Sequence, residues 1–151
     1  MPSTYARQII AVEWKQRGLE FLAAAMLLYQ RQGHTFVVAH LIAQSCELLA
    51  KSYLIWADPE LTEPELRVLG HDLVKLCDRL SRCLGKSCLN AGSSRQLTEL
   101  NELFKTHQLR YAGYLQHILA PATIPDCGLL LKRIYKLIKL ANRNHVWQLP
   151  P

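Results

Sequence analysis

The sequence predicts an all-α fold, an up-and-down helical bundle of four long helices or five. Apolar residues recur at intervals of three and four over most of the chain, as in amphipathic helices. No segment alternates apolar and polar residues as a half-buried strand does. The chain has 151 residues, of which 50% are hydrophobic, enough for one packed core. We therefore predict a single domain over residues 1–151, with a core at about 5–142 and a C-terminal tail at 143–151.

The first half of the chain predicts two long helices, at residues 5–31 and 35–57. Gly33 is in the position of a glycine that ends a helix, and Asp58-Pro59 stops the second helix. The first helix has one predicted apolar face, formed by Leu19, Leu22, Met26 and Tyr29. The core candidates of the second are Val37, Val38, Leu41, Leu48 and Ile55.

The second half predicts shorter helices separated by clear breaks. Thr62 and Glu65 form a capping box that opens a short helical turn, which ends at Gly70. Glycine, serine and asparagine make 85–94 a loop, and two prolines make 120–128 irregular. The remaining helices are predicted at 72–84, 94–110 and 127–142. Their core residues are Leu73, Leu76 and Leu80, then Leu97, Leu100, Leu103 and Phe104, then Leu130, Ile134, Leu137 and Ala141.

Composition narrows the classes of protein that fit. The longest apolar run, 21–29, is far shorter than the roughly 20 residues of a transmembrane helix, so we expect no membrane contact. The N-terminus does not resemble a signal peptide, so we expect a cytoplasmic protein with reduced thiols. The spacing of Cys83 and Cys88 leaves metal binding open, but buried hydrophobic thiols fit better, and we predict no metal and no cofactor. No P-loop, GxSxG, HExxH or dinucleotide-binding motif occurs.

Several polar residues interrupt the apolar pattern. Gln44, Glu47 and Lys51 share one face of the second helix, either as a solvated stripe or facing the bundle. His71 or Asp72 can cap the helix that follows Gly70. Arg110, beside Tyr111, offers a donor fork for a phosphate or pairs with a buried carboxylate such as Glu47. Both alternatives stay open for Arg110.

Three segments carry a resemblance to a known family: AQSCELLAKSYL at 43–54, GHDLVKL at 70–76 and LRYAGY at 109–114. In this order and spacing they resemble the HEPN family (higher eukaryotes and prokaryotes nucleotide-binding). The resemblance implies a helical bundle with a groove that binds a nucleotide or RNA, commonly a homodimer, in some members beside a nucleotidyltransferase-type partner as toxin and antitoxin. The ligand-binding residues that it implies are Gln44, Glu47, Lys51, His71, Asp72, Arg110 and Tyr111.

The resemblance also offers a catalytic alternative, a metal-independent ribonuclease. HEPN ribonucleases carry an arginine followed closely by a histidine, and Arg110 and His117 match that spacing. The arginine would hold a phosphate while the histidine moves a proton. Tyr111 replaces the polar residue that often follows the arginine in nucleases, which points to the non-nuclease branch, and Ala112 replaces the proline that this branch often has.

The positive charge concentrates near the C-terminus. The chain has a net charge of +6, and residues 125–151 hold five basic residues and one acidic residue. Four of the basic residues share one face of the last predicted helix: Lys132, Lys136, Lys139 and Arg143, with Arg133 on the flank. This face is either an ordinary solvated surface or a phosphate-binding one. Three hypotheses therefore remain: a nucleotide- or RNA-binding bundle, a ribonuclease using Arg110 and His117, and a non-catalytic protein-association module.

Overall fold

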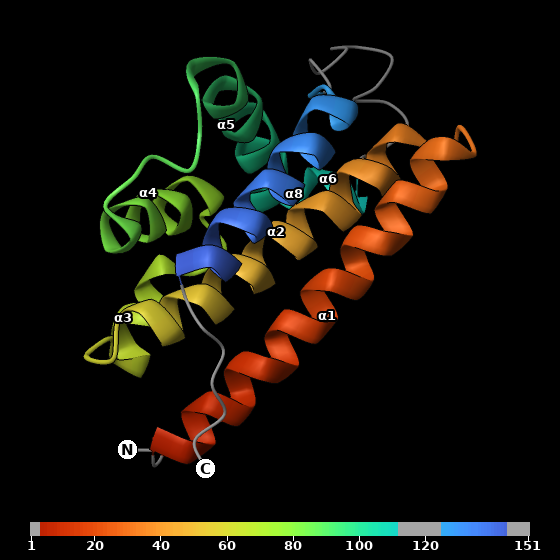
Figure 1. Cartoon of the computed structure of the whole chain (residues 1–151). Helices are drawn as coiled ribbons and strands as arrows, with labels where there is room; N and C mark the ends of the chain where they lie inside the picture. Colours follow the sequence, from red (N-terminus) through yellow and green to blue (C-terminus); the bar gives the residue numbers. More distant parts are fainter. Residues whose placement is uncertain (1–3, 112–124, 145–151) are drawn as a thin grey trace.

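The computed structural model describes residues 4–111 and 125–144, which form helices joined by short connections, without a strand (Figure 1). The prediction of an all-α fold is confirmed. The helices are α1 (Thr4–Gln30), α2 (Thr35–Ala57), α3 (Glu63–Leu69), α4 (Leu73–Leu84), α5 (Ala91–Lys105), α6 (Gln108–Tyr111) and α8 (Cys127–Asn144).

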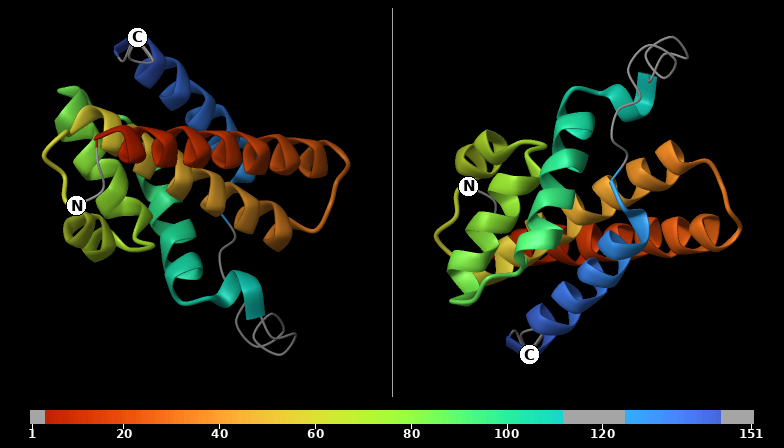
Figure 2. Two further views of the ribbon diagram at one scale, coloured as in Figure 1. Left: turned by 90° about the horizontal axis from the view of Figure 1, so that it is seen from below. Right: turned by 90° about the horizontal axis from the view of Figure 1, so that it is seen from above.

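Helix α2 is the centre of the fold. It packs against α1, α4, α5, α6 and α8, and more than half of its residues are buried. Leu49, Tyr53 and Leu54 have no exposed surface. Each such side chain contributes roughly 1.5–3 kcal/mol by leaving water. Helix α1 runs beside α2 over most of its length, and Figure 2 shows α8 crossing this pair at an angle.

Helices α1 and α2 pack through small residues. Ala11, Gly18 and Ala25 of α1 are buried. A Cβ atom on Gly18 would lie only 2.8 Å from Leu49 Cγ, so the two helices approach closely at this point. The hydroxyl of Ser52 donates a 2.7 Å hydrogen bond to the carbonyl of Ala11, which ties the two helices together.

The predicted apolar face of α1 is therefore partly wrong. Leu22 is buried and Leu19 is partly buried, but Met26 and Tyr29 are 42% and 48% exposed. Because apolar residues occur on every side of α1, periodicity did not indicate which side faces the core. Among the core candidates of α2, Val38 is buried and Val37 is exposed, and the remaining three are partly buried: Leu41, Leu48 and Ile55.

The ends of the first helices follow capping rules, with one correction. After α1, the Gly33 N–H bonds to the Leu28 carbonyl and the Gln32 N–H to the Tyr29 carbonyl, as in a Schellman motif. The residue in the left-handed conformation is Gln32, with a φ of 55°. Gly33 therefore lies one residue beyond the helix-ending position in which the sequence predicts it. The capping box of Thr62 and the end of α3 at Gly70 are confirmed, and Gly70 has a φ of 54°.

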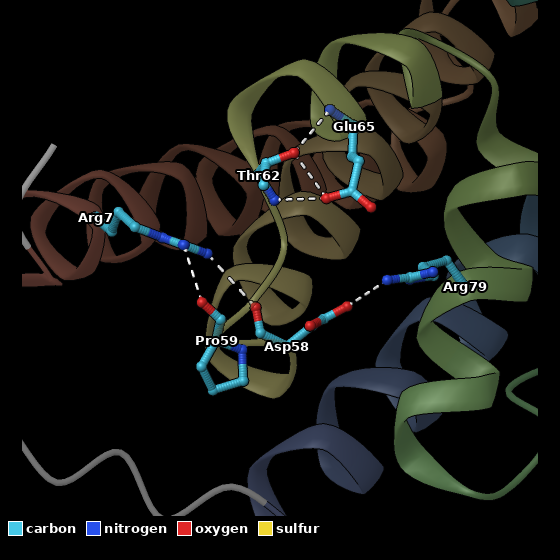
Figure 3. A network of polar contacts seen from close by, with 6 residues as sticks. All are labelled: Arg7, Asp58, Pro59, Thr62, Glu65 and Arg79. Carbon is cyan, nitrogen blue, oxygen red and sulfur yellow. Dashed lines mark hydrogen bonds and ion pairs between the residues drawn. The ribbon is translucent and has the colours of Figure 1, made fainter. Parts of the chain in front are cut away.

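A polar network holds the connection between α2 and α3 (Figure 3). Arg7 of α1 donates to the carbonyl of Pro59 at 3.0 Å, and Arg79 of α4 pairs with the carboxylate of Asp58 at 2.5 Å. The hydrogen bond to Asp58 raises the pKa of Arg79. The same picture shows the capping box, in which the Thr62 N–H donates to the Glu65 carboxylate at 2.8 Å.

The later helices match the prediction in their cores but not in all their boundaries. Every predicted core residue of α4, α5 and α8 is buried. However, the predicted helix at 94–110 is wrong at both ends. It begins at Ala91, capped by Asn90, and stops at Lys105. His107 then takes a φ of 59° before α6 begins.

The structure also bears on membranes and thiols. None of the helices in the described ranges is long and apolar enough to cross a membrane. Four of the five cysteines are buried and Cys83 is partly buried, as expected of small hydrophobic side chains. Within residues 4–111 and 125–144, no group of three or more histidine, cysteine or acidic side chains is arranged to hold a metal ion.

We expect Gly18→Leu to lower the free energy of unfolding by about 1–3 kcal/mol, because the new side chain overpacks the contact with Leu49. Urea unfolding followed by circular dichroism measures the loss. Ala23→Leu, on the exposed side of the same helix, is the control and should change stability by less than about 0.5 kcal/mol. Equal stability of the two variants would contradict the close packing of α1 on α2.

Candidate functional site

Glu47 is the most deeply buried of the predicted polar residues whose side chains the structure describes. Its side chain is 7% exposed, and its carboxylate accepts a 2.6 Å hydrogen bond from Lys51 Nζ. His71 Nδ1 lies 2.9 Å from Oε2 and 3.0 Å from Oε1 of the same carboxylate. A buried carboxylate is costly unless it is paired, and here it has two partners. The open alternatives for this face are thus resolved: Glu47 and Lys51 face the bundle, and Gln44 is partly buried.

His71 joins this carboxylate to the surface. The side chain is 62% exposed, and its ring meets the ring of Phe104 edge-on, with the centroids 6.1 Å apart. Because an ionised carboxylate only accepts hydrogen bonds, Nδ1 carries the hydrogen in this pairing. The other ring nitrogen, Nε2, is then able to accept a proton or a hydrogen bond from outside.

Asp72 caps α4, so the cap is this residue and not His71. Its carboxylate accepts from the Lys75 N–H and from the Asn101 side-chain amide, each at 3.1 Å. Asn101 in turn accepts from the Leu73 N–H at 2.8 Å. Burial raises the pKa of Asp72, but these two hydrogen bonds, together with the charges of Lys75 and Lys105, outweigh it, and the pKa lies below its usual value. Asn101, which no sequence motif indicated, fixes the start of α4 against α5.

We call these residues the carboxylate cluster: Glu47, Lys51, His71, Asp72 and Asn101. The cluster joins α2, α4 and α5; Glu47 is paired within it by Lys51, and Asp72 is paired with Lys75 outside it. It brings together four of the predicted ligand-binding residues.

The remaining predicted ligand-binding residues are only partly described. Arg110 and Tyr111 belong to α6, which packs beside α2 and α5. Their side chains, and His117 entirely, lie outside the described residues. The pairing of Arg110 with a ligand or a carboxylate, and the ribonuclease that uses Arg110 and His117, therefore stay predictions.

The basic residues of α8 divide between two cavities. Lys136, Lys139 and Arg143 line a cavity of about 280 Å³ between α8 and the loop before α5. Lys132 lines a different cavity, on the side of α8 that faces α1. Arg133, on the flank of the predicted face, and Lys86, from the loop, complete the first cavity. Lys86 was missed because it is distant in sequence and only the fold brings it to α8.

We call the five basic residues of this cavity the α8 cation face: Lys86, Arg133, Lys136, Lys139 and Arg143. Among the described residues, no acidic side chain lines the cavity. Across the part of the chain that the structure describes, none of the five forms an ion pair.

Arg133 and Cys88 both bear on the charge of this cavity. The Nε atom of Arg133 is buried and has no hydrogen-bond partner among the described residues. Burial raises the pKa of the Cys88 thiol, although the Ser81 hydroxyl and the charge of Arg133 oppose the shift. Cys88 therefore stays a neutral thiol and adds no negative charge. The described lining of the cavity is thus strongly cationic.

A third cavity, of about 470 Å³, lies between α1 and the start of α3 and is mainly apolar. It contains Ile10, Trp14 and Leu66. Arg7, the basic residue in its described lining, is already bonded to backbone carbonyls of the α2–α3 connection. This cavity is therefore a weaker candidate for an ionic ligand than the one on α8.

Comparison of the chain with protein-family models, with curated proteins and with solved structures found no match. The resemblance to HEPN proteins therefore depends on the three sequence segments alone. A proposal about function has to stand on that resemblance together with the carboxylate cluster and the α8 cation face.

We expect Glu47→Ala to lower the free energy of unfolding by roughly 3 kcal/mol, because it leaves the mostly buried ammonium of Lys51 without its partner. The double variant Glu47→Leu, Lys51→Met should recover most of this loss, since it removes both charges. Glu63→Ala, which breaks an exposed pair with Arg67, is the control and should cost less than about 1 kcal/mol. Urea unfolding measures all three, and a double variant no more stable than Glu47→Ala would contradict the pairing.

Proposed function

We propose that this chain is a HEPN-like helical bundle that binds a nucleotide or RNA through the α8 cation face. The observation that carries the proposal is the cavity in which five basic side chains meet, with no acidic residue in its described lining. Phosphate groups are the natural ligands of such a surface, since each neutralised phosphate releases bound counterions.

The placement of these cations on α8 supports a binding role. The inner residues of α8, among them Ile134 and Leu137, are buried in the core, and the helix packs against α2. The helix backbone is therefore held in one position, and the basic side chains project from a rigid element. A rigid site loses less entropy on binding than one carried on a loop.

The carboxylate cluster is a weaker candidate for the phosphate site. The charge of Lys51 is neutralised by Glu47 at 2.6 Å, and Asp72 adds a second carboxylate beside His71 in the chain. A phosphate that approached His71 would meet these negative groups. The exposed imidazole can still contact another part of the ligand, which is the role that the family resemblance suggests for this region.

We expect binding of a fluorescently labelled single-stranded RNA to weaken steeply with salt, because phosphate contacts release counterions. In the double variant Lys136→Ala, Arg143→Ala, the slope of log K against log salt should fall in magnitude by about 1.4, or roughly 0.7 for each cation lost. Fluorescence anisotropy at several salt concentrations measures this slope.

The matched control is Arg67→Ala, Lys75→Ala, which removes the same charge from α3 and α4. It should keep the wild-type slope, because these two cations are exposed and already paired with carboxylates. If both double variants lose affinity and slope equally, binding depends on net charge alone and the α8 site is refuted.

The proposal includes pairing of the chain with a second copy. Tyr5, Ile9, Val12 and Leu27 lie along α1, and they are 42–67% exposed. Large apolar side chains gathered on one exposed helix are typical of interfaces. A second copy presents the same surface, so the two can pair about a two-fold axis. A nucleotidyltransferase-type protein is the alternative occupant of this face.

We expect the chain to sediment as a dimer at micromolar concentration and Ile9→Glu, Leu27→Glu to sediment as a monomer, since the new charges would be buried at the interface. Val68→Glu, at an 80% exposed position on α3, is the control and should stay dimeric. A wild-type chain that is monomeric throughout would reject self-pairing and leave the face to another protein.

A further inference from the structure

A second cavity lies on another side of α8 from the α8 cation face. It has a volume of about 430 Å³ and lies between the end of α1 and the start of α8. Its walls are unlike those of the cationic cavity, because they are largely aromatic and apolar. The residues that give it this character are Met26, Tyr29, Leu131 and Tyr135, with Gln30 and Lys132 as polar members.

The two tyrosines are available to a ligand. Tyr29 is 48% exposed and Tyr135 is 53% exposed, and Met26 beside them is 42% exposed. These exposed surfaces of the three side chains are not buried in the core. A planar aromatic group placed here would cover apolar surface on both helices and could stack on a phenol ring.

Gly128 allows Tyr29 to pack close to α8 in the wall of this cavity. A Cβ atom at this position would lie 2.6 Å from the hydroxyl oxygen of Tyr29, closer than any real contact. Because Gly128 has no side chain, the Tyr29 ring can pack directly against α8. A larger residue would displace the Tyr29 ring from this position.

A side-chain contact along α8 links the two cavities. Lys132 lines the aromatic cavity, and Lys139 lines the cationic one. Tyr135 is between them, and Lys139 Nζ lies 4.7 Å from the centroid of its ring, a cation–π contact. Aromatic rings interleaved with cations are what single-stranded nucleic acids use, since bases stack and phosphates follow the positive charge.

We propose that the aromatic cavity takes an unpaired base of a single-stranded nucleic acid whose phosphates lie along the α8 cation face. This inference rests on the proposed function and narrows the ligand from any phosphate compound to a strand with accessible bases. A duplex would not supply such a base, because its bases are stacked and paired.

The α8 cation face is long enough along the helix to contact several nucleotides of one strand. From Arg133 to Arg143, both in the α8 cation face, an α-helix rises about 15 Å, at roughly 1.5 Å per residue. Successive phosphates along one strand of a duplex are roughly 3.4 Å apart along the axis. The α8 cation face therefore covers several phosphate spacings, more than one free phosphate group requires.

The test compares two labelled oligonucleotides of eight nucleotides, one RNA of mixed sequence and one with the same sugar-phosphate backbone but no bases. Fluorescence anisotropy gives the dissociation constant of each. The wild-type chain should bind the base-bearing strand about tenfold more tightly, the order expected for a stacked base. Tyr135→Leu and Tyr29→Leu should lose this preference and bind the abasic strand unchanged.

Two further variants separate the aromatic contact from other effects. Gly128→Ala should also reduce the preference for bases, because its methyl group displaces the Tyr29 ring while alanine favours the helix. Val68→Leu, at an 80% exposed position on α3, should behave as wild type. Circular dichroism confirms that each variant is folded.

The outcomes distinguish the inference from the proposed function. If wild type and both tyrosine variants bind the two strands equally well, the cations still bind phosphates but the aromatic cavity takes no base, and the inference is overturned. If the wild-type chain binds neither strand even at low salt, the proposed function fails together with the inference.

Discussion

The burial of α2 on nearly every side is the constraint on which the rest of the structure depends. Its apolar side chains form the middle of the core, so α1, α4, α5 and α8 all find their places by packing on it. Most buried polar groups in proteins find a hydrogen-bond partner. Glu47 does so through Lys51 and His71, and Ser52 through a carbonyl of α1. These contacts fix how the neighbouring helices dock.

The same constraint shapes the candidate binding surface. Because the inner leucines and isoleucines of α8 pack in the core, its basic residues lie on the outer side of the helix. The loop before α5 closes over one flank of α8 and adds Lys86, while the end of α1 closes the other flank and adds Tyr29. A charged cavity and an aromatic cavity thus result from the packing of a single helix against two different neighbours.

The sequence predicts those parts of the fold whose signals are local. The bounds of α2, the capping box at Thr62 and the core leucines of α4 all follow from spacing and capping chemistry. The buried face of α1 did not follow, since α1 carries apolar residues on every side and packs through Gly18 and other small residues. The break at His107 carries no glycine or proline, so nothing local indicated it.

The residues of the candidate site also divide into those with a local sequence signal and those without one. Glu47 and Asp72 stand out locally as polar residues in apolar helices. Asn101 and Lys86 do not, because their roles come from residues far away in sequence, on α4 and α8. The separation of Lys132 from the rest of the basic row depends on which neighbour packs on each side of α8, which no spacing rule supplies.

Nuclear magnetic resonance tests the central role of α8 most directly. A ¹H–¹⁵N spectrum of the chain would be recorded while a single-stranded RNA oligonucleotide is added. We expect the amide shifts to change at 86–88, along α8 and at the end of α1, while those of α3 stay constant. Shifts that change only around His71 and α6, with α8 unaffected, would contradict a binding role for α8.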